Sequence, residues 1–323
     1  MPTRTFMYWN IENFGAGKRG KYTVTGPQLV NFIANVIIRN NVSLFAMNEV
    51  RSSLGNQLGL DLAFALNSVQ VTANWTHHAS PKFMKGRDEQ YLFLWRRDWI
   101  GNTNFVWAFD NPSSPPPLLG FPTQVTTARP PYLGYFYDAT GIGLGFRVAA
   151  FHAPGPGYFN GVKRACNNLA KVADFVPTSG NDGVVIMGDC NVKFVADASV
   201  AGSFGAQAFQ PLLAAKFRQA DIGLTSLKSV KDADPSWTIE DAYNQPYDQV
   251  FVRNSKYVGS TGASREELLD ECMNGNYLEG LLAAVDGQRT GMTPVSYTNV
   301  ADAFVSFRKY VSDHMPVVVD IAF

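Results

Sequence analysis

The stretch VVIMGDCNV, residues 184–192, is an apolar run that ends on an acid, a cysteine and an amide. The apolar half predicts a β-strand in a hydrophobic core, with apolar side chains on both faces. Asp189 and Asn191 are two residues apart, so a continuing strand would point both side chains to the same face. A turn is the alternative, because Asp and Asn are ordinary turn formers. This stretch alone favours neither a continuing strand nor a turn, so it has to be interpreted together with the other motifs of the chain.

The composition is that of a chain that can bury a large core. Of the 323 residues, 46% are hydrophobic and 13% are aromatic, which excludes a disordered or collagen-like chain. Lysine plus arginine and aspartate plus glutamate both number 27, so the formal net charge is zero. No overall field draws such a protein to nucleic acid or membrane, and any polyanion binding must come from a local patch.

The chain carries no recognisable signal for secretion or membrane insertion. Residues 1–15 contain no apolar run of signal-peptide length, and no other window approaches the length of a membrane span. We therefore expect a cytoplasmic or at least leaderless protein without a membrane span. Cys166, Cys190 and Cys272 are too few and too scattered for a disulfide framework or a zinc site, so we expect reduced thiols.

Strand and helix patterns alternate along the chain. Apolar residues fall at helical spacing in residues 26–41, with Thr25 as a candidate N-cap, and residues 160–176 are also helix-like. Short apolar runs typical of strands occupy residues 42–50, 91–95, 146–152, 184–191, 247–253 and 315–323. Strands outnumber helices, and the helices lie between them. This pattern predicts a layered α/β (α+β) protein with sheet packed on sheet and helices outside.

Two segments depart from the alternation. Residues 111–122, NPSSPPPLLGFP, cannot form a central strand because proline lacks the donor that a ladder needs, so we expect a surface loop. Residues 254–300 contain acidic, helix-like stretches with too few apolar positions for a core of their own. We interpret them as a helical insertion on a single domain that spans residues 1–323.

Polar residues end or interrupt several of the apolar runs. They are Asn10, Glu49, His152, Asp189, Asn191, Asp248, Asp313 and His314. Each alone is explained by a turn or a satisfied core histidine, but several acids and imidazoles at strand ends are typical of functional sites. The chain has only four histidines, and two of them belong to this set. The other two, His77 and His78, are interpreted as a solvated loop pair.

The motifs that contain these residues follow the order seen in a known family. They are WNIENFG, NEVR, EQYLFLWR, FHAPGPG, MGDCN, YDQVFV and SDHMPV. The series resembles the endonuclease/exonuclease/phosphatase superfamily and, within it, the DNase I-like branch. The resemblance runs from Asn10 to the carboxyl terminus. It implies a four-layer fold, two packed mixed β-sheets flanked by helices, with the active site at one edge of the sandwich.

The resemblance also implies a metal site. Glu49, Asn10 and Asp313 match the divalent-metal cluster of the family, and Glu49 matches the main ligand. Asp189 and Asn191 match the pair that orients the attacking water and the phosphate. Carboxylate and amide oxygens are ligands that Mg²⁺ prefers, so we expect Mg²⁺, with Mn²⁺ or Ca²⁺ as alternatives.

Two histidines complete the implied site. His314 matches a general base or phosphate ligand, with Asp248 as the carboxylate that orients it. His152 matches the general acid of the DNase branch, and Glu89 matches the carboxylate that pairs with it. Two imidazoles, each held by an acid, can transfer protons on opposite sides of an in-line displacement at phosphorus.

Arginines favour a polynucleotide substrate. Arg51 and Arg129 fall where DNase I-like enzymes place arginines in the minor groove and against phosphate, tasks that suit the planar guanidinium. The chain departs from the pattern at two positions, because Arg87 replaces a minor-groove tyrosine and Tyr243 replaces a phosphate-site threonine. We group Arg51, Arg87 and Arg129 as candidate substrate-binding residues.

The resulting expectation is a Mg²⁺-dependent phosphodiesterase, most simply a non-specific DNA endonuclease that leaves 5′-phosphate ends. The alternative on the same scaffold is a lipid or inositol phosphodiesterase or phosphatase that resembles bacterial sphingomyelinases. A binding protein on an inactive scaffold is a third interpretation, which the complete set of catalytic positions disfavours. DNA is the expected partner, and we expect a monomer without a protein partner.

Overall fold

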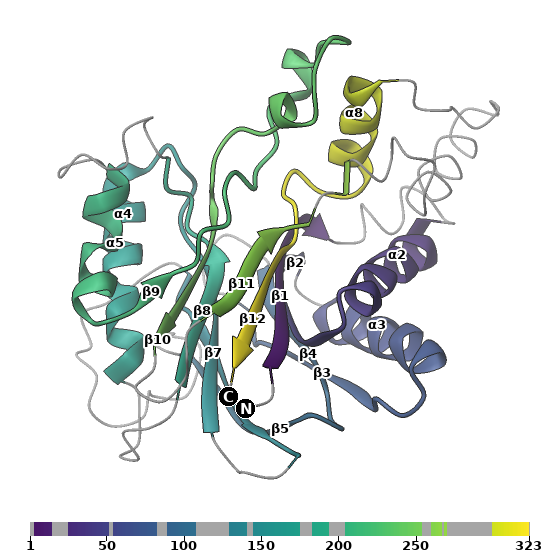
Figure 1. Ribbon diagram of the computed structural model, residues 1–323, viewed down its shortest axis with the longest axis vertical. Helices are drawn as coiled ribbons and strands as arrows, with labels where there is room; N and C mark the ends of the chain where they lie inside the picture. Colours follow the sequence, from purple (N-terminus) through teal and green to yellow (C-terminus); the bar gives the residue numbers. More distant parts are fainter. Residues whose placement is uncertain are drawn as a thin grey trace.

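The computed structural model describes residues 3–14, 25–51, 54–82, 89–107, 129–140, 145–174, 183–193, 204–253, 260–266, 268–269 and 299–322. These residues form two β-sheets that pack face to face, with helices on the outer faces (Figure 1).

The first sheet has the strand order β11-β12-β1-β2-β4-β3. Its central strands β1 and β2 are parallel, and the other neighbours are antiparallel. Helix α2 (Thr25–Arg39) lies between β1 and β2 in the chain and makes the crossover that a parallel pair requires. The strands are β1 (Thr3–Phe14), β2 (Val42–Arg51), β3 (Trp75–Ala79), β4 (Glu89–Arg96), β11 (Ser260–Arg265) and β12 (Val317–Ala322).

The second sheet repeats this plan with the order β5-β6-β7-β8-β10-β9. The central strands β7 and β8 are again parallel. Helix α4 (Phe159–Leu169) and the short 3₁₀ helix η1 (Ala170–Asp174) make the crossover between them. The strands are β5 (Ile100–Trp107), β6 (Tyr132–Asp138), β7 (Gly145–His152), β8 (Gly183–Asp189), β9 (Arg218–Gln219) and β10 (Asp248–Arg253).

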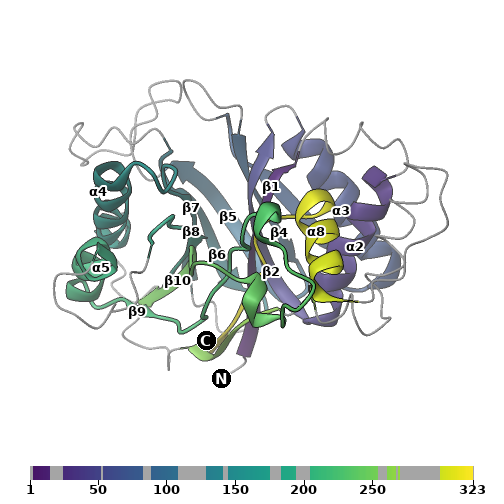
Figure 2. The same cartoon turned by 90° about the horizontal axis from the view of Figure 1, so that it is seen from above.

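Three apolar clusters hold the layers together. One lies between the first sheet and helices α2, α3 (Gly55–Val69) and α8 (Val300–Tyr310). A second, rich in aromatic residues, lies between the two sheets, and a third packs α4 and α5 (Phe204–Ala214) on the second sheet. Figure 2 shows the resulting order of layers, from α4 and α5 through both sheets to α2, α3 and α8. The predicted two mixed sheets flanked by helices are confirmed.

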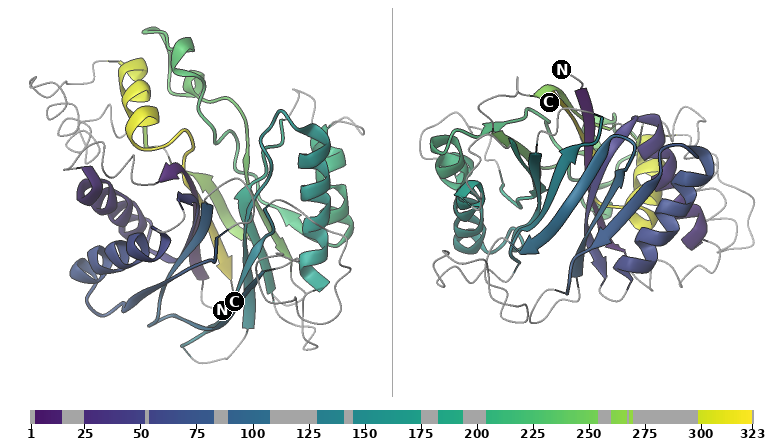
Figure 3. Two further views of the ribbon diagram at one scale, coloured as in Figure 1. Left: turned by 180° about the vertical axis from the view of Figure 1, so that it is seen from behind. Right: turned by 90° about the horizontal axis from the view of Figure 1, so that it is seen from below.

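The parallel pairs define one end of the sandwich. The amino and carboxyl ends of the chain lie together at the opposite end, where β1 pairs with β12 (Figure 3). The carboxyl ends of β1, β2, β7 and β8 therefore meet at the end that the termini leave free. Helix α8 and the segment between β9 and β10, which carries η2 (Val230–Asp232) and η3 (Glu240–Ala242), rise beside this end (Figure 1).

Most of the predicted elements are present, with two differences. His77 and His78 lie on β3 and not in a loop, because β3 pairs with β4 along its whole length. Within residues 254–300, Ser260–Arg265 form edge strand β11 on β12, so this part belongs to the sheet and is not helical. The loop expected at residues 111–122 and most of the expected insertion lie outside the described residues. In the described part of the chain, no helix is long and apolar enough to span a membrane.

Candidate active site

Strand β8 ends at Asp189, and the chain turns directly after it. Asn191 has a positive φ of 50°, and its backbone N–H donates to Oδ1 of Asp189 at 2.8 Å. Its side chain also folds back, because Nδ2 donates to Oδ2 of Asp189 at 3.1 Å. The acid and the amide therefore meet through a turn and not through the pleat of a continuing strand. Cys190 between them is buried in the cluster under α4 and α5, on the side away from the site.

Irregular backbone at the ends of β1 and β2 directs Asn10 and Glu49, the amide and the acid of the first sheet, into the site. The β1–β2 register shifts after Asn10, and the β2–β4 register shifts between Met47 and Val50. Glu49 lies in this shift with a φ of 57°, and its Oε2 accepts from the backbone N–H of Asn13 at 3.0 Å. Bulges of this kind re-aim side chains next to active sites, and unfavourable φ values cluster there.

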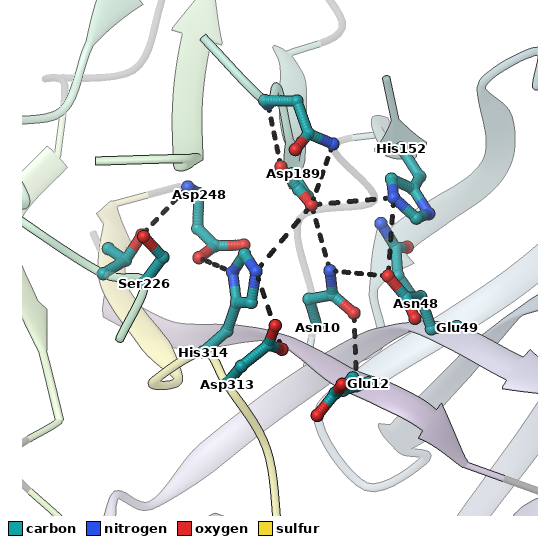
Figure 4. Close-up of polar contacts among 12 residues, drawn as sticks. Asn10, Glu12, Asn48, Glu49, His152, Asp189, Ser226, Asp248, Asp313 and His314 are labelled. Atoms are coloured by element: carbon teal, nitrogen blue, oxygen red, sulfur yellow. Dashed lines mark hydrogen bonds and ion pairs between the residues drawn. The ribbon is translucent and has the colours of Figure 1, made fainter. Parts of the chain in front are cut away.

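Asp189 lies at the centre of the site (Figure 4). Nδ2 of Asn10 donates to its Oδ2 at 3.0 Å and to Oε1 of Glu49 at 3.3 Å, so one amide bridges the two carboxylates and the two sheets. Nε2 of His152 lies 3.6 Å from the same Oδ2, and Nε2 of His314 lies 4.0 Å from it. Burial raises the pKa of Asp189 to about 6, although the charges of the two histidines oppose the rise.

His152 ends β7, and a buried carboxylate lies beside its ring. Its Nδ1 lies 3.3 Å from Oε2 of Glu89, and its Nε2 lies 3.6 Å from Oε1 of Glu49. Glu89 is in turn held by Arg129, whose Nη2 donates to Oε1 at 3.2 Å while Nη1 donates to the carbonyl of Ala153 at 2.8 Å. The chain of contacts from Arg129 through Glu89 to His152 is buried throughout.

His314 also faces a buried carboxylate, in this case through a hydrogen bond. Its Nδ1 lies 2.6 Å from Oδ2 of Asp248, which is fully buried at the start of β10. Burial alone would lower the pKa of His314, but Asp248 and the nearby Asp313 and Asp189 raise it well above the usual histidine value. Each histidine thus turns one ring nitrogen to a carboxylate and the other toward Asp189.

Asp313 contacts the ring nitrogen of His314 that also faces Asp189 (Figure 4). Its Oδ1 is 3.8 Å from Nε2 of His314, and its Oδ2 is 3.7 Å from Nη2 of Arg308 on α8. Nη1 of Arg308 donates to the carbonyl of Leu227 at 3.0 Å. Arg308 was not singled out from the sequence, because an arginine on a helix normally belongs to a solvated face.

The candidate substrate-binding arginines occupy different environments. Arg51 is exposed at the rim and donates to Oδ1 of Asn13, beside Glu49. Arg129 is 6% exposed and lies behind Glu89, so its position favours a structural role, and the phosphate contact expected of it stays a prediction. Arg87 lies outside the described residues.

A divalent cation fits the residues at the centre of the site. Ligand atoms of Glu49, His152 and Asp189 lie within 4.8 Å of one another. Burial raises the pKa of Asp189, and a bound cation would favour its charged form. Of the ligands implied by the resemblance, Glu49 belongs to this group. Asn10 turns its amide nitrogen to the carboxylates, and Asp313 contacts His314, so their coordination stays a prediction.

Tyr247 is a second residue at the site that was not singled out from the sequence. Its ring centroid lies 6.1 Å from that of His314, and the side chain is 9% exposed. Burial, with smaller effects from Asp189 and Asp313, raises the pKa of Tyr247 to about 12. The available signal was its place directly before Asp248 in the motif YDQVFV.

Comparison with solved structures identifies the architecture. An endonuclease/exonuclease/phosphatase family protein from Bacteroides thetaiotaomicron superposes with a TM-score of 0.60 at 15% identity, over 100% of this chain and 95% of that chain. The protein has the endonuclease/exonuclease/phosphatase fold. The mannosyl-6-phosphatase Bt3783 of B. thetaiotaomicron VPI-5482 gives a TM-score of 0.60 at 15% identity, over 99% of this chain and 100% of that chain. D. rerio TDP2, complexed with single strand DNA product, gives 0.56 at 9% identity and covers 100% of both chains.

The sequence comparisons add no closer relative. No family model matches the chain, and no curated protein matches it. At 9–15% identity, the structural similarity establishes the fold and leaves the substrate open. It confirms the architecture that the motif series implied. Proteins of this fold include phosphatases and DNA-bound enzymes, so the substrate must be argued from the site itself.

Proposed function

We propose that the protein is a metal-dependent phosphodiester hydrolase and that its substrate is DNA, which it cleaves endonucleolytically to leave 5′-phosphate ends. One observation carries the proposal. Nε2 of His152 and Nε2 of His314 both lie within 4.0 Å of one oxygen of Asp189, and the other nitrogen of each ring faces a buried carboxylate. This arrangement supports a reaction centre with an imidazole on either side of it.

The two histidines have separate roles in the proposed reaction. A water oxygen attacks phosphorus and passes a proton to the carboxylate of Asp189, the bond from phosphorus to the 3′-oxygen breaks, and the leaving 3′-oxygen takes a proton. His152 donates that proton from Nε2, because its Nδ1 lies 3.3 Å from the buried Glu89 carboxylate and so faces away from the substrate. The raised pKa of His314 favours a protonated ring that donates to a phosphate oxygen, over the alternative of a general base.

Asp189 and Asn191 place the nucleophile. The carboxylate of Asp189 accepts from Asn10 and Asn191 and lies between the histidines, where it can orient the attacking water. Glu49 and Asp189 would hold the divalent cation, together with Asn10 and Asp313 if their oxygens turn toward it, while His152 beside them keeps its Nε2 for proton donation. The cation supplies positive charge to the phosphate oxygens and lowers the pKa of water.

His152 supports cleavage of an ester with an alkoxide leaving group, which phosphodiesters and alkyl phosphomonoesters share. An alkoxide leaving group needs a proton in the transition state, and a buried, oriented imidazole is suited to deliver it. The second candidate is a lipid or inositol phosphodiesterase or phosphatase, and the phosphatase of the same fold keeps this open. The exposed Arg51 at the rim, next to Glu49, favours an extended polyanion over a small phosphate ester.

A substrate panel tests the proposal. Purified protein is incubated with supercoiled plasmid, with sphingomyelin and with a sugar phosphate, each in Mg²⁺ and in EDTA. We expect nicked plasmid in Mg²⁺ alone, with ends that DNA ligase reseals because they carry 5′-phosphate. If the protein hydrolyses sphingomyelin or the sugar phosphate but leaves the plasmid intact, DNA is not the substrate, and the second candidate, a lipid or inositol phosphodiesterase or phosphatase, is supported instead. Absence of turnover on every substrate would overturn the proposal.

A further inference from the structure

Three buried polar side chains cross the core between the sheets. Tyr8 on β1, Asn48 on β2 and Tyr91 on β4 belong to the first sheet, and each is at most 1% exposed. Their neighbours in the inter-sheet cluster are almost all apolar or aromatic. Burying polar groups in such a core is unfavourable unless they are hydrogen-bonded, so their partners indicate what they do.

Tyr8 and Tyr91 bond to the backbone of the two residues at the centre of the site. The backbone N–H of Asp189 donates to the Tyr8 hydroxyl at 2.9 Å. The backbone N–H of His152 donates to the Tyr91 hydroxyl at 3.1 Å. Asp189 and His152 are register partners at the ends of β8 and β7, so two phenols of one sheet hold adjacent strand ends of the other. Burial raises the pKa of both tyrosines, which keeps the hydroxyls neutral.

Asn48 joins the same network. Its Nδ2 donates to the Tyr8 hydroxyl at 2.6 Å and to the carbonyl of Phe151 at 2.6 Å. Oδ1 of Asn48 is buried without a hydrogen-bond partner among the described residues. The two donated bonds of Asn48 therefore link Tyr8 of the first sheet to the β7 backbone of the second.

Gly188 shows how closely the strand ends approach each other. A Cβ atom at this position would lie 2.1 Å from the carbonyl oxygen of Phe151, and only glycine avoids that contact. The Phe151 carbonyl is the one that Asn48 also holds. The network therefore acts where β7 and β8 are tightest, immediately before His152 and Asp189.

We infer that Tyr8 and Tyr91 are positioning residues that set the distance between the halves of the active site. Tyr8, supported by Asn48, places Asp189 against Glu49 and Asn10 of its own sheet. Tyr91 places His152. The inference rests on the proposed function. In that proposal Asp189, which Tyr8 positions, orients the attacking water, and His152, which Tyr91 positions, protonates the leaving group.

The two assignments predict different kinetics. Tyr8→Phe should lower kcat about 10- to 100-fold with KM nearly unchanged, the usual range for outer-shell partners of a metal site. This loss should be the same for poor and good leaving groups. Tyr91→Phe should slow cleavage of DNA by a similar factor but spare a p-nitrophenyl phosphodiester, whose leaving group needs no proton.

Tyr132→Phe is the matched control. Tyr132 is also a buried tyrosine of the inter-sheet cluster, and its hydroxyl lies 2.9 Å from Nε2 of His78, outside the catalytic contacts. The Tyr132→Phe variant should lose about as much stability in urea unfolding as the other two variants, and it should keep wild-type kcat. If Tyr8→Phe and Tyr91→Phe match Tyr132→Phe in kcat, their role is structural only and the inference is overturned.

Two further measurements separate this inference from the proposed function. Mn²⁺ binding is followed by electron paramagnetic resonance, and the amide resonances of Asp189 and His152 by ¹H–¹⁵N spectroscopy. If the wild type cleaves no phosphoester, the proposed function fails, but about tenfold weaker Mn²⁺ binding by Tyr8→Phe than by Tyr132→Phe still supports positioning. Unchanged Mn²⁺ affinity with an unshifted Asp189 amide in Tyr8→Phe, or a wild type that binds no Mn²⁺, overturns it.

Discussion

Nε2 of His152 lies 3.6 Å from Oδ2 of Asp189, and the two residues are register partners at the ends of parallel strands β7 and β8. The sheet itself therefore brings the imidazole and the carboxylate together. Helix α4 and η1 make this possible, since only a crossover connection lets adjacent strands end at the same edge. The first sheet contributes Asn10 and Glu49 through the same arrangement of β1, α2 and β2.

Removal of charge at Glu49 should weaken the response to Mg²⁺. Glu49→Gln keeps the shape of the side chain but removes the negative charge that a hard divalent cation requires. The Mg²⁺ concentration for half-maximal activity should rise about tenfold or more, or activity should vanish. Asp61→Asn, on the distant helix α3, is the control. A wild-type Mg²⁺ titration for Glu49→Gln would contradict the assignment.

Arg129 should affect stability and not the salt dependence of DNA binding. Arg129→Met leaves the buried Glu89 carboxylate without its guanidinium, which should destabilise the fold by about 3–5 kcal/mol in urea unfolding. Because Arg129 is buried, the slope of log affinity against log salt should not change. Arg51→Ala should lessen that slope by roughly 0.9 if Arg51 contacts a phosphate. A lower slope of log affinity against log salt for Arg129→Met would instead support the phosphate contact that the sequence predicts for Arg129.

His78 should make stability fall at acid pH. Its ring stacks on Phe105 with centroids 3.9 Å apart, and burial, with the charge of His77, lowers the pKa to about 4 from 6.5. Between pH 6.5 and pH 4, His78 is protonated in the unfolded chain but not in the folded chain. Stability is therefore lost as pH falls from 6.5 to 4. Because His78 is partly exposed, solvent screens its charge, and we expect the free energy of unfolding to fall by about 1–2 kcal/mol.

The variant His78→Phe keeps an aromatic ring against Phe105 and removes the titration. Urea unfolding of wild type and variant at pH 7 and near the lower pKa gives the comparison. The stability difference between the two proteins should shift in favour of the variant at low pH. An identical difference at both pH values would show that His78 does not contribute.

Cys190 should be dispensable for activity. Its side chain is 1% exposed, and burial raises the pKa of the thiol well above its usual value, so the reactive thiolate does not form. Cys190→Ala should keep wild-type kcat and lose about 1–2 kcal/mol of stability through the small cavity. Inactivation of the wild type by a thiol reagent, absent in Cys190→Ala, would instead place the thiol at the site.

The sequence predicted the layers better than the contacts between them. Apolar runs and helical spacing show which segments are strands and helices, because burial on both faces of a strand leaves a continuous apolar run. Residues 184–191 fit both a continuing strand and a strand followed by a turn, and the structure has the turn, because β8 stops at Asp189 and Asn191 adopts a positive φ. Period-two alternation could not reveal that the two side chains meet through a turn.

Contacts between the sheets have no signature in linear spacing. Tyr8 and Asn48 look like core positions in the sequence, and their bonds to β7 and β8 arise only when the sheets pack. Arg129 and Arg51 likewise look alike as isolated arginines, whereas packing buries the first behind Glu89 and leaves the second at the rim. Residue type and motif order could indicate which side chains gather, including Glu89 beside His152 and Asp248 beside His314, but not which residues of the opposite sheet contact them.

The central claim is that two oriented imidazoles cleave a phosphodiester at this site, and single-turnover cleavage of a labelled DNA duplex in Mg²⁺ tests it most directly. His152→Ala and His314→Ala should each be slower than wild type by at least about a hundredfold while circular dichroism shows an intact fold. His77→Ala, which removes an imidazole from β3 outside the site, should cleave at the wild-type rate. Near wild-type cleavage by a folded His152→Ala or His314→Ala protein would contradict the claim.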